Sequence, residues 1–108
     1  DNVKNDEQYY RYYIVSLMQQ GNFTEALKVG KHLLNKYNNP KNYDLIANIY
    51  YMNKDYENAV KYFESAYASN QSVKTLLPLS DVLFVYLKQK QKAISYLDTK
   101  EVLALIGA

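Results

Sequence analysis

A short segment recurs three times along this chain at nearly constant spacing. Residues 21–28 are matched by residues 54–61, and a weaker copy follows at residues 88–95. An alanine holds the same place in each copy, at spacings of 33 and then 34 residues. The three alanines are Ala26, Ala59 and Ala93. A period in this range indicates stacked helical hairpins, each too small to bury its apolar face alone. The chain is therefore predicted to be an all-α binding scaffold.

Apolar side chains before each break lie at i, i+3, i+4 and i+7, which is the pattern of one helix face. In the first unit this face is formed by Tyr10, Tyr13, Ile14 and Leu17. In the second unit it is formed by Tyr43, Ile46, Ala47 and Tyr50.

The breaks carry residues that start helices. Asn22, followed by Glu25 three positions later, predicts a capping box. Asn39 precedes Pro40, which suits the first helical position, and Asp55 is the expected cap of the next helix. We therefore expect helices joined by short turns and no strand.

The third unit follows the pattern more loosely. Residues 76–87 are nearly apolar all round, which predicts a helix buried on several sides. Pro78 is expected in the first turn of that helix, where a missing N–H costs little. Residues 88–92 are expected to form the turn that follows.

The chain end predicts a short terminal helix over residues 99–107. Asp98 and Glu101 form a second capping-box pair, and apolar residues 102–106 precede Gly107. A helix of about two turns is not stable alone. We expect it to cover the open edge of the third hairpin, while self-association through it, or contact with further repeats, remains open.

These residues resemble the tetratricopeptide repeat (TPR) family, whose unit has about 34 residues. The second unit carries the match best, through Tyr43, Ile46, Ala47, Tyr50, Tyr56, Ala59, Phe63 and Ala66. The resemblance implies a right-handed solenoid of about three antiparallel helical hairpins plus the terminal helix. It places the units at about residues 7–38, 40–72 and 74–98 of a single TPR-like domain, residues 1–108. Because the chain starts at Asp1 and not at Met, a fragment of a longer protein is also consistent with the sequence.

The first unit departs from the family pattern at two positions. Ile14 is bulky where the family has a small residue, and Gly30 stands where an aromatic residue is usual. We interpret this as a volume exchange in which Ile14 fills the space that Gly30 leaves. The alternative is a mid-helix glycine that merely costs about 1 kcal/mol.

Composition excludes several kinds of chemistry. There is no cysteine, and only three glycines are present, none in a phosphate-binding loop. The lone histidine, His32, is predicted to lie on the surface of its helix. We expect no enzyme activity, no metal and no cofactor. The net charge of +2 argues against nucleic-acid partners. No signal peptide or membrane span is visible in the sequence, and the compartment is not indicated.

Thirteen tyrosines are the main oddity of the composition. Five are expected in the core: Tyr10, Tyr13, Tyr43, Tyr50 and Tyr67. Tyr51 and Tyr86 flank the core stripe. By the resemblance, the first helix of each hairpin lines a concave groove. The positions that map to it are Arg11, Val15, Met18, Lys41, Asp44, Asn48, Tyr51, Met52, Val82, Val85 and Tyr86. Tyrosine, methionine and arginine are residues that interfaces favour.

The leading hypothesis is therefore a protein–protein interaction scaffold that binds a peptide or partner protein in this groove. The alternative is a structural segment of a longer solenoid with no ligand of its own. RNA binding, as in pentatricopeptide hairpins of 35 residues, fits neither the spacing nor the charge. The carboxylate clamp of chaperone-binding TPR proteins is disfavoured, because Val15, Ile49 and Leu79 do not reproduce its residues.

Overall fold

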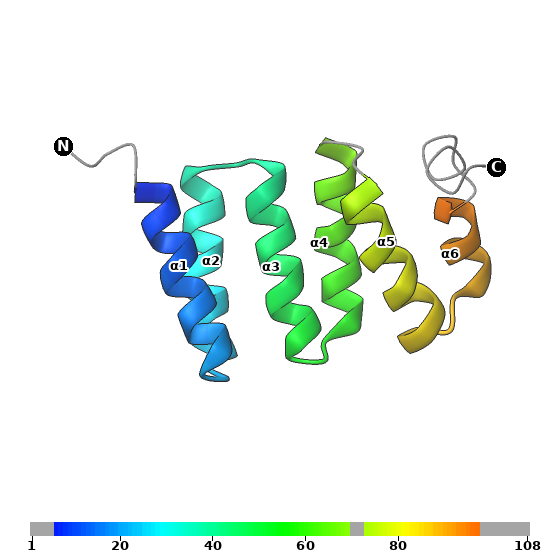
Figure 1. The fold of residues 1–108 in the computed structure, drawn as a ribbon, viewed down its shortest axis with the longest axis horizontal. Coiled ribbons are helices and arrows are strands. Elements are labelled where there is room, and N and C mark those ends of the chain that lie inside the picture. The colour runs from blue at the N-terminus through cyan, green and yellow to red at the C-terminus, as the bar shows by residue number, and fades with distance from the viewer. Residues whose placement is uncertain (1–5, 70–72, 98–108) are drawn as a thin grey trace.

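The computed structural model describes residues 6–69 and 73–97, and every regular element among them is helical (Figure 1). The elements are α1 (Asp6–Gln19), α2 (Phe23–Lys36), α3 (Pro40–Met52), α4 (Tyr56–Ser69), α5 (Val73–Asp81), the π-helical turn η2 (Val82–Tyr86) and α6 (Lys90–Leu97). This confirms the predicted all-α, TPR-like hairpin repeat. The predicted terminal helix lies outside the described residues.

The helices form a row in chain order. Figure 1 shows α1 and α2, α3 and α4, and then α5 and α6 as successive hairpins along the longest dimension of a stack of 48 × 28 × 20 Å. The second helix of one hairpin also packs against the first helix of the next, α2 on α3 and α4 on α5. Each hairpin therefore buries its apolar face against its neighbour, as a repeat of this period requires.

The first two hairpin turns close in the same way. Gly21 and Lys54 adopt left-handed backbone conformations, with φ of +76° and +64°. The N–H of the next residue reaches back into the helix, from Asn22 to Leu17 O and from Asp55 to Tyr50 O, both at 2.9 Å. These bonds satisfy carbonyl groups that a helix end would otherwise leave unpaired.

The predicted N-caps are confirmed. Each capping side chain accepts a hydrogen bond from the backbone N–H three residues later. The pairs are Asn22 with Glu25 at 3.4 Å, Asn39 with Asn42 at 3.1 Å and Asp55 with Asn58 at 3.3 Å. Pro40 is the first residue of α3, as expected.

Two clusters of buried side chains hold the stack together. The N-terminal cluster consists of Ile14, Leu17, Met18, Ala26, Leu33, Leu45 and Ile49. The central cluster consists of Ile46, Ala47, Tyr50, Ala59, Val60, Phe63, Leu79, Val82, Leu83 and Ala93. Since α3 contributes to both, it connects the first hairpin to the rest of the core. Ala26, Ala59 and Ala93 are all fully buried, which explains why the repeat has a small residue there.

Three predictions for the third hairpin are wrong. Pro78 lies in the interior of α5, because that helix begins at Val73. The turn after η2 is shorter than predicted, since α6 starts at Lys90. Residues 76–87 are buried on one side only: Leu77, Phe84 and Val85 are 45–48 % exposed. At the start of the following turn, the Leu87 N–H donates a π-helical hydrogen bond to Val82 O, five residues back, at 3.0 Å.

Gly30 makes a close contact, but not with the predicted partner. A β-carbon built at Gly30 would lie 3.3 Å from side-chain atoms of both Ile46 and Ile49. The space is therefore used by α3 of the next hairpin, and Ile14 is not among the nearest atoms. The correction follows from packing between hairpins, which the sequence of one unit does not contain.

Of the five tyrosines predicted in the core, Tyr50 alone is buried. Tyr50 is 8 % exposed, but Tyr13 is 42 % exposed on α1, where no preceding hairpin among the described residues covers it. Tyr10, Tyr43 and Tyr67 are half-buried. His32 is exposed, as predicted.

Candidate functional site

The predicted groove positions differ in how far a partner could reach them. Four apolar or aromatic side chains, Val15, Met52, Val85 and Tyr86, are 38–46 % exposed. Lys41 is exposed, and Arg11, Asp44, Asn48 and Tyr51 are half-buried. Together these nine residues are called the first-helix surface below, since α1, α3 and η2 supply them.

Met18 and Val82 do not reach this surface. They are 7 % and 1 % exposed and belong to the N-terminal and central clusters. Their placement shows that a groove position taken from the family pattern alone can be a core position here. We therefore leave both out of the candidate site.

Three tyrosines gather at one end of the first-helix surface. The rings of Tyr56 and Tyr86 are stacked, with centroids 4.1 Å apart and planes inclined by 14°. Tyr51 meets both edge-on, at 5.8 Å from Tyr56 and 5.9 Å from Tyr86. The tyrosine cluster joins α3, α4 and η2. Offset-stacked and edge-to-face arrangements are the favourable geometries for aromatic pairs, so the cluster presents an ordered surface.

Hydrogen bonding within the tyrosine cluster also affects the pKa of Tyr51. Hydrogen bonding to Tyr86, and then burial, raises the pKa of Tyr51 above its ordinary value. The Tyr51 phenol therefore remains neutral near pH 7, and it can donate or accept hydrogen bonds at the rim of an apolar patch. Tyr56 was not among the predicted groove residues, because its place at the start of α4 assigns it to the second helix.

A polar network lies between α1 and α3 at the other end of this surface. Asn42 is fully buried, and its amide nitrogen donates to Glu7 Oε2 at 2.9 Å and to Tyr37 O at 2.8 Å. Arg11 Nη1 donates to Asn42 Oδ1 at 2.6 Å. Asn39 Nδ2 adds a further bond to Glu7 Oε2 at 2.8 Å. Every polar atom of the buried amide thus has a partner, which buried polar groups require.

The network fixes the charge state of Glu7. Hydrogen bonding from Asn39 is the largest cause that lowers the pKa of the Glu7 carboxyl, and burial opposes it. Glu7 stays ionised while Asn42 and Asn39 donate to it. Arg11, one of the predicted groove positions, has one guanidinium nitrogen engaged in this network.

Asp44 of α3 carries a second carboxyl group that interacts with Arg11. Burial raises its pKa, and the nearby Arg11 charge opposes that shift. Asn48 Nδ2 donates to Asp44 O at 2.9 Å and to Asp44 Oδ2 at 3.4 Å. These partners belong to the same helix, so Asp44 keeps acceptor capacity that a partner could use.

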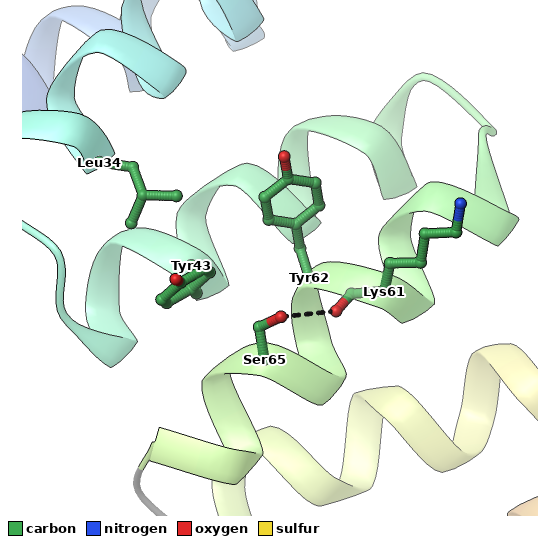
Figure 2. A pocket seen from close by; sticks show the side chains of 5 residues that line it. All are labelled: Leu34, Tyr43, Lys61, Tyr62 and Ser65. Carbon is green, nitrogen blue, oxygen red and sulfur yellow. Dashed lines mark hydrogen bonds between the residues drawn. The ribbon is translucent and has the colours of Figure 1, made fainter.

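A hollow that sequence reasoning missed lies among α2, α3 and α4. It has a volume of about 410 Å³ and is lined by Leu34, Tyr43, Lys61, Tyr62 and Ser65 (Figure 2). None of these is a predicted groove residue. The only sequence signal was the excess of tyrosine, which does not say where two tyrosines on different helices meet.

The described residues offer little for other kinds of site. Within residues 6–69 and 73–97, no group of three or more histidine, cysteine or acidic side chains is placed to hold a metal ion. No helix in the same part of the chain has the length and apolar character needed to cross a bilayer.

A protein-family model matches most of this chain. The family model described as "Anaphase-promoting complex, cyclosome, subunit 3" matches residues 19–100, well over half of the chain. The matched range includes the second helix of the first hairpin and all of the next two. A comparison with curated proteins found no match.

Proposed function

Because the chain belongs to the family described as anaphase-promoting complex, cyclosome, subunit 3, a family of TPR-type repeats, we propose that it is a non-catalytic scaffold that holds a peptide or partner protein. TPR-type repeats generally bind protein partners. The proposed contact area is the first-helix surface, with the tyrosine cluster as its anchor.

The observation that carries this proposal is the exposure of apolar side chains beside the tyrosine cluster. Val85 and Met52 are 45 % and 46 % exposed, and each is the chain neighbour of a cluster tyrosine. Ordered aromatic side chains with an apolar surround are typical of the few residues that supply most of the binding energy at an interface.

Polar residues along the same surface supply a rim. Lys41 and Asp44 lie on one side of α3, one turn apart, and Asn48 follows one turn later. A polar rim around an apolar centre is the usual anatomy of a protein–protein interface. This supports a protein or peptide partner, and the net charge of +2 gives no comparable support for a nucleic acid.

Affinity capture from the native cell extract tests the proposal with a matched pair of variants. Val85→Asp places a charge in the candidate surface, while Ile94→Asp makes the same change on α6, where Ile94 is 41 % exposed. We expect Val85→Asp and Tyr51→Ala to lose the captured partner and Ile94→Asp to retain it. If all three variants retain the captured partner equally, that partner does not bind through the first-helix surface, and the proposed contact area is wrong.

The alternative function is a structural segment of a longer solenoid. Exposure on α1 favours it, because Tyr9 and Tyr12 are 66 % and 67 % exposed. Exposed aromatic side chains on an end helix are what a neighbouring repeat would cover. Sedimentation of the chain distinguishes the two functions: concentration-dependent association that Tyr9→Ser with Tyr12→Ser abolishes would favour the solenoid segment.

A further inference from the structure

A second candidate surface lies among α2, α3 and α4. Figure 2 shows Leu34 of α2 and Tyr43 of α3 on one side of the hollow, with Tyr62, Lys61 and Ser65 of α4 across from them. Its volume of about 410 Å³ falls at the lower end of the range for ligand pockets. It shares no residue with the first-helix surface, so its function is separate from the one proposed above.

The walls of this pocket are aromatic and held in place. Tyr62 stacks on the buried Tyr50, with centroids 5.5 Å apart and planes inclined by 27°. Tyr43 lies 6.3 Å from Tyr62, and Asn38 Nδ2 donates to the Tyr43 hydroxyl at 3.3 Å. Leu34 packs against the central cluster. A ligand would therefore meet a preformed apolar surface with phenol groups at its edge.

The charge beside these walls is positive. Lys61 lines the pocket. Lys31 lies one turn before Leu34 on α2, and its Nζ is 5.8 Å from the centre of the Tyr50 ring. Hydrogen bonding to Tyr50 is the largest cause that raises the pKa of Lys31, so Lys31 stays protonated near pH 7.

Within the described residues, no ion pair involves Lys31 or Lys61. None of the lining residues is acidic. The two ion pairs among the described residues, Lys36–Asp6 and Lys92–Glu64, involve neither of these lysines. Ser65 uses its hydroxyl hydrogen on Lys61 O at 3.1 Å and can still accept a bond.

We propose that this pocket binds an acidic segment of a partner polypeptide, with a carboxylate held by Lys31 and Lys61 and an adjacent apolar side chain against Leu34 and Tyr62. Lys61 in the lining and Lys31 one turn from Leu34 favour an anion, and the apolar wall favours a ligand that also carries an apolar group. Two lysines are too few for the extended phosphate contacts of a nucleic-acid site. A pocket of this volume suits a few side chains at most.

Isothermal titration of the whole chain with two capped peptides tests the proposal. The probe is acetyl-Glu-Glu-Phe-Leu-Glu-Glu-amide, and its match replaces every Glu with Gln. We expect the acidic peptide to bind at least tenfold more tightly than the neutral one. Equal binding of both peptides, or binding of neither, would overturn the proposal.

Charge-matched variants locate the site. Lys31→Gln with Lys61→Gln should weaken binding of the acidic peptide at least tenfold. Lys41→Gln with Lys54→Gln removes the same charge outside the pocket and should change binding less than twofold. An equal effect of the two pairs would mean non-specific attraction and would refute the site. Circular dichroism checks that both double variants remain helical.

Two further probes separate the other classes of ligand. Amide chemical shifts should change around Tyr43, Tyr62 and Ser65 on addition of the acidic peptide, and changes confined to the first-helix surface would contradict the proposal. Sodium phosphate that produces the same shifts with equal affinity would make this an inorganic-anion site. A thymidine decanucleotide that binds more tightly than the peptide would make it a nucleic-acid site. Either result overturns the peptide assignment.

Discussion

Consecutive hairpins pack against each other at two joints, α2 on α3 and α4 on α5, and the side chains that fill these joints differ. At the first joint, between α2 and α3, Gly30 leaves room for Ile46 and Ile49. At the second joint, between α4 and α5, Phe63 lies 33 residues after Gly30 and packs in one cluster with Leu79 and Val82. Leu79 and Val82 themselves lie 33 residues after Ile46 and Ile49.

The polar contacts of the two joints differ as well. The first joint has the buried amide of Asn42 with bonds to Glu7, Arg11 and Tyr37. At the second hairpin boundary, Tyr96 of α6 donates to Glu64 Oε2 of α4 at 2.9 Å, and Lys92 pairs with the same oxygen at 3.0 Å. The comparison teaches that the first joint packs α3 side chains over a glycine and buries a hydrogen-bonded amide, whereas the second joint packs an aromatic ring and has its polar bonds at half-buried side chains.

The largest expected effect concerns the bulk at the second joint. Phe63→Ala should lower the free energy of unfolding by about 3–5 kcal/mol, because Phe63 is 1 % exposed and its removal leaves a cavity. Phe63→Leu, which keeps most of the volume, should cost less than about 1.5 kcal/mol. Urea unfolding followed by circular dichroism measures both. Equal losses would show that shape, and not volume, limits this joint.

The next effect concerns the directional bonds of the first joint. Asn42→Leu should cost about 2–3 kcal/mol, because it removes the donor to Tyr37 O, the acceptor of Arg11 Nη1 and one of the two amide donors to Glu7. Asn48→Leu is the control, since the Asn48 amide bonds only within its own helix, and it should cost less than about 1 kcal/mol. A neutral Asn42→Leu would mean that apolar packing alone holds the first joint.

A smaller effect tests the shared alanine of the repeat. Ala59 is fully buried, and Ala59→Leu should cost about 1–3 kcal/mol through overpacking. Lys61 is exposed on the same helix, and Lys61→Leu should change the stability by no more than about 0.5 kcal/mol. Equal shifts in melting temperature would contradict the assigned faces of α4.

The smallest expected effects are changes of stability with pH, because each joint has one group with a shifted pKa, Glu7 at the first and Tyr96 at the second. The folded pKa of Glu7 lies below its ordinary value of 4.5, so its stabilisation is present above that pH and is lost as pH falls through the folded pKa. Burial, followed by the bond to Glu64, raises the pKa of Tyr96 to about 12 from 10.0, so its stabilisation is present below pH 10 and is lost as pH rises toward 12.

Melting temperature against pH checks these signs. Glu7→Gln should flatten the acid side of the curve and leave the alkaline side unchanged. Tyr96→Phe should do the reverse. If either variant alters the opposite side, the assignment of that group to its joint is incorrect.

Local sequence was sufficient for the helices and their caps, because a cap depends on residues three positions apart. Asn22, Asn39 and Asp55 accept the cap hydrogen bond as predicted, although the Asn22 N–H donates to Leu17 O where a capping box would have it donate to Glu25. It was insufficient wherever partners lie a full unit apart. The bond from Asn42 to Glu7 spans 35 positions, and the neighbours of Gly30 belong to the next hairpin.

The same limit applies to the candidate site. Family positions identified Tyr51 and Tyr86 on the first-helix surface, but they also included the buried Met18 and Val82. Burial depends on how far two neighbouring helices approach, and one unit does not encode that distance. Tyr62 was missed for the same reason, since its stacking on Tyr50 requires α3 and α4 together.

The π-helical turn η2 explains why the third unit is one residue longer than the second. Leu79 and Val82 still follow Ile46 and Ile49 by 33 positions, yet the left-handed Lys88 follows the left-handed Lys54 by 34. The added residue therefore lies between Val82 and Lys88, where Leu87 N–H reaches five residues back to Val82 O. A π-turn is what an α-helix becomes when one residue is inserted within it. The lengthening is absorbed inside a helix, so the inter-helix turn stays short and Ala93 still reaches its place in the core.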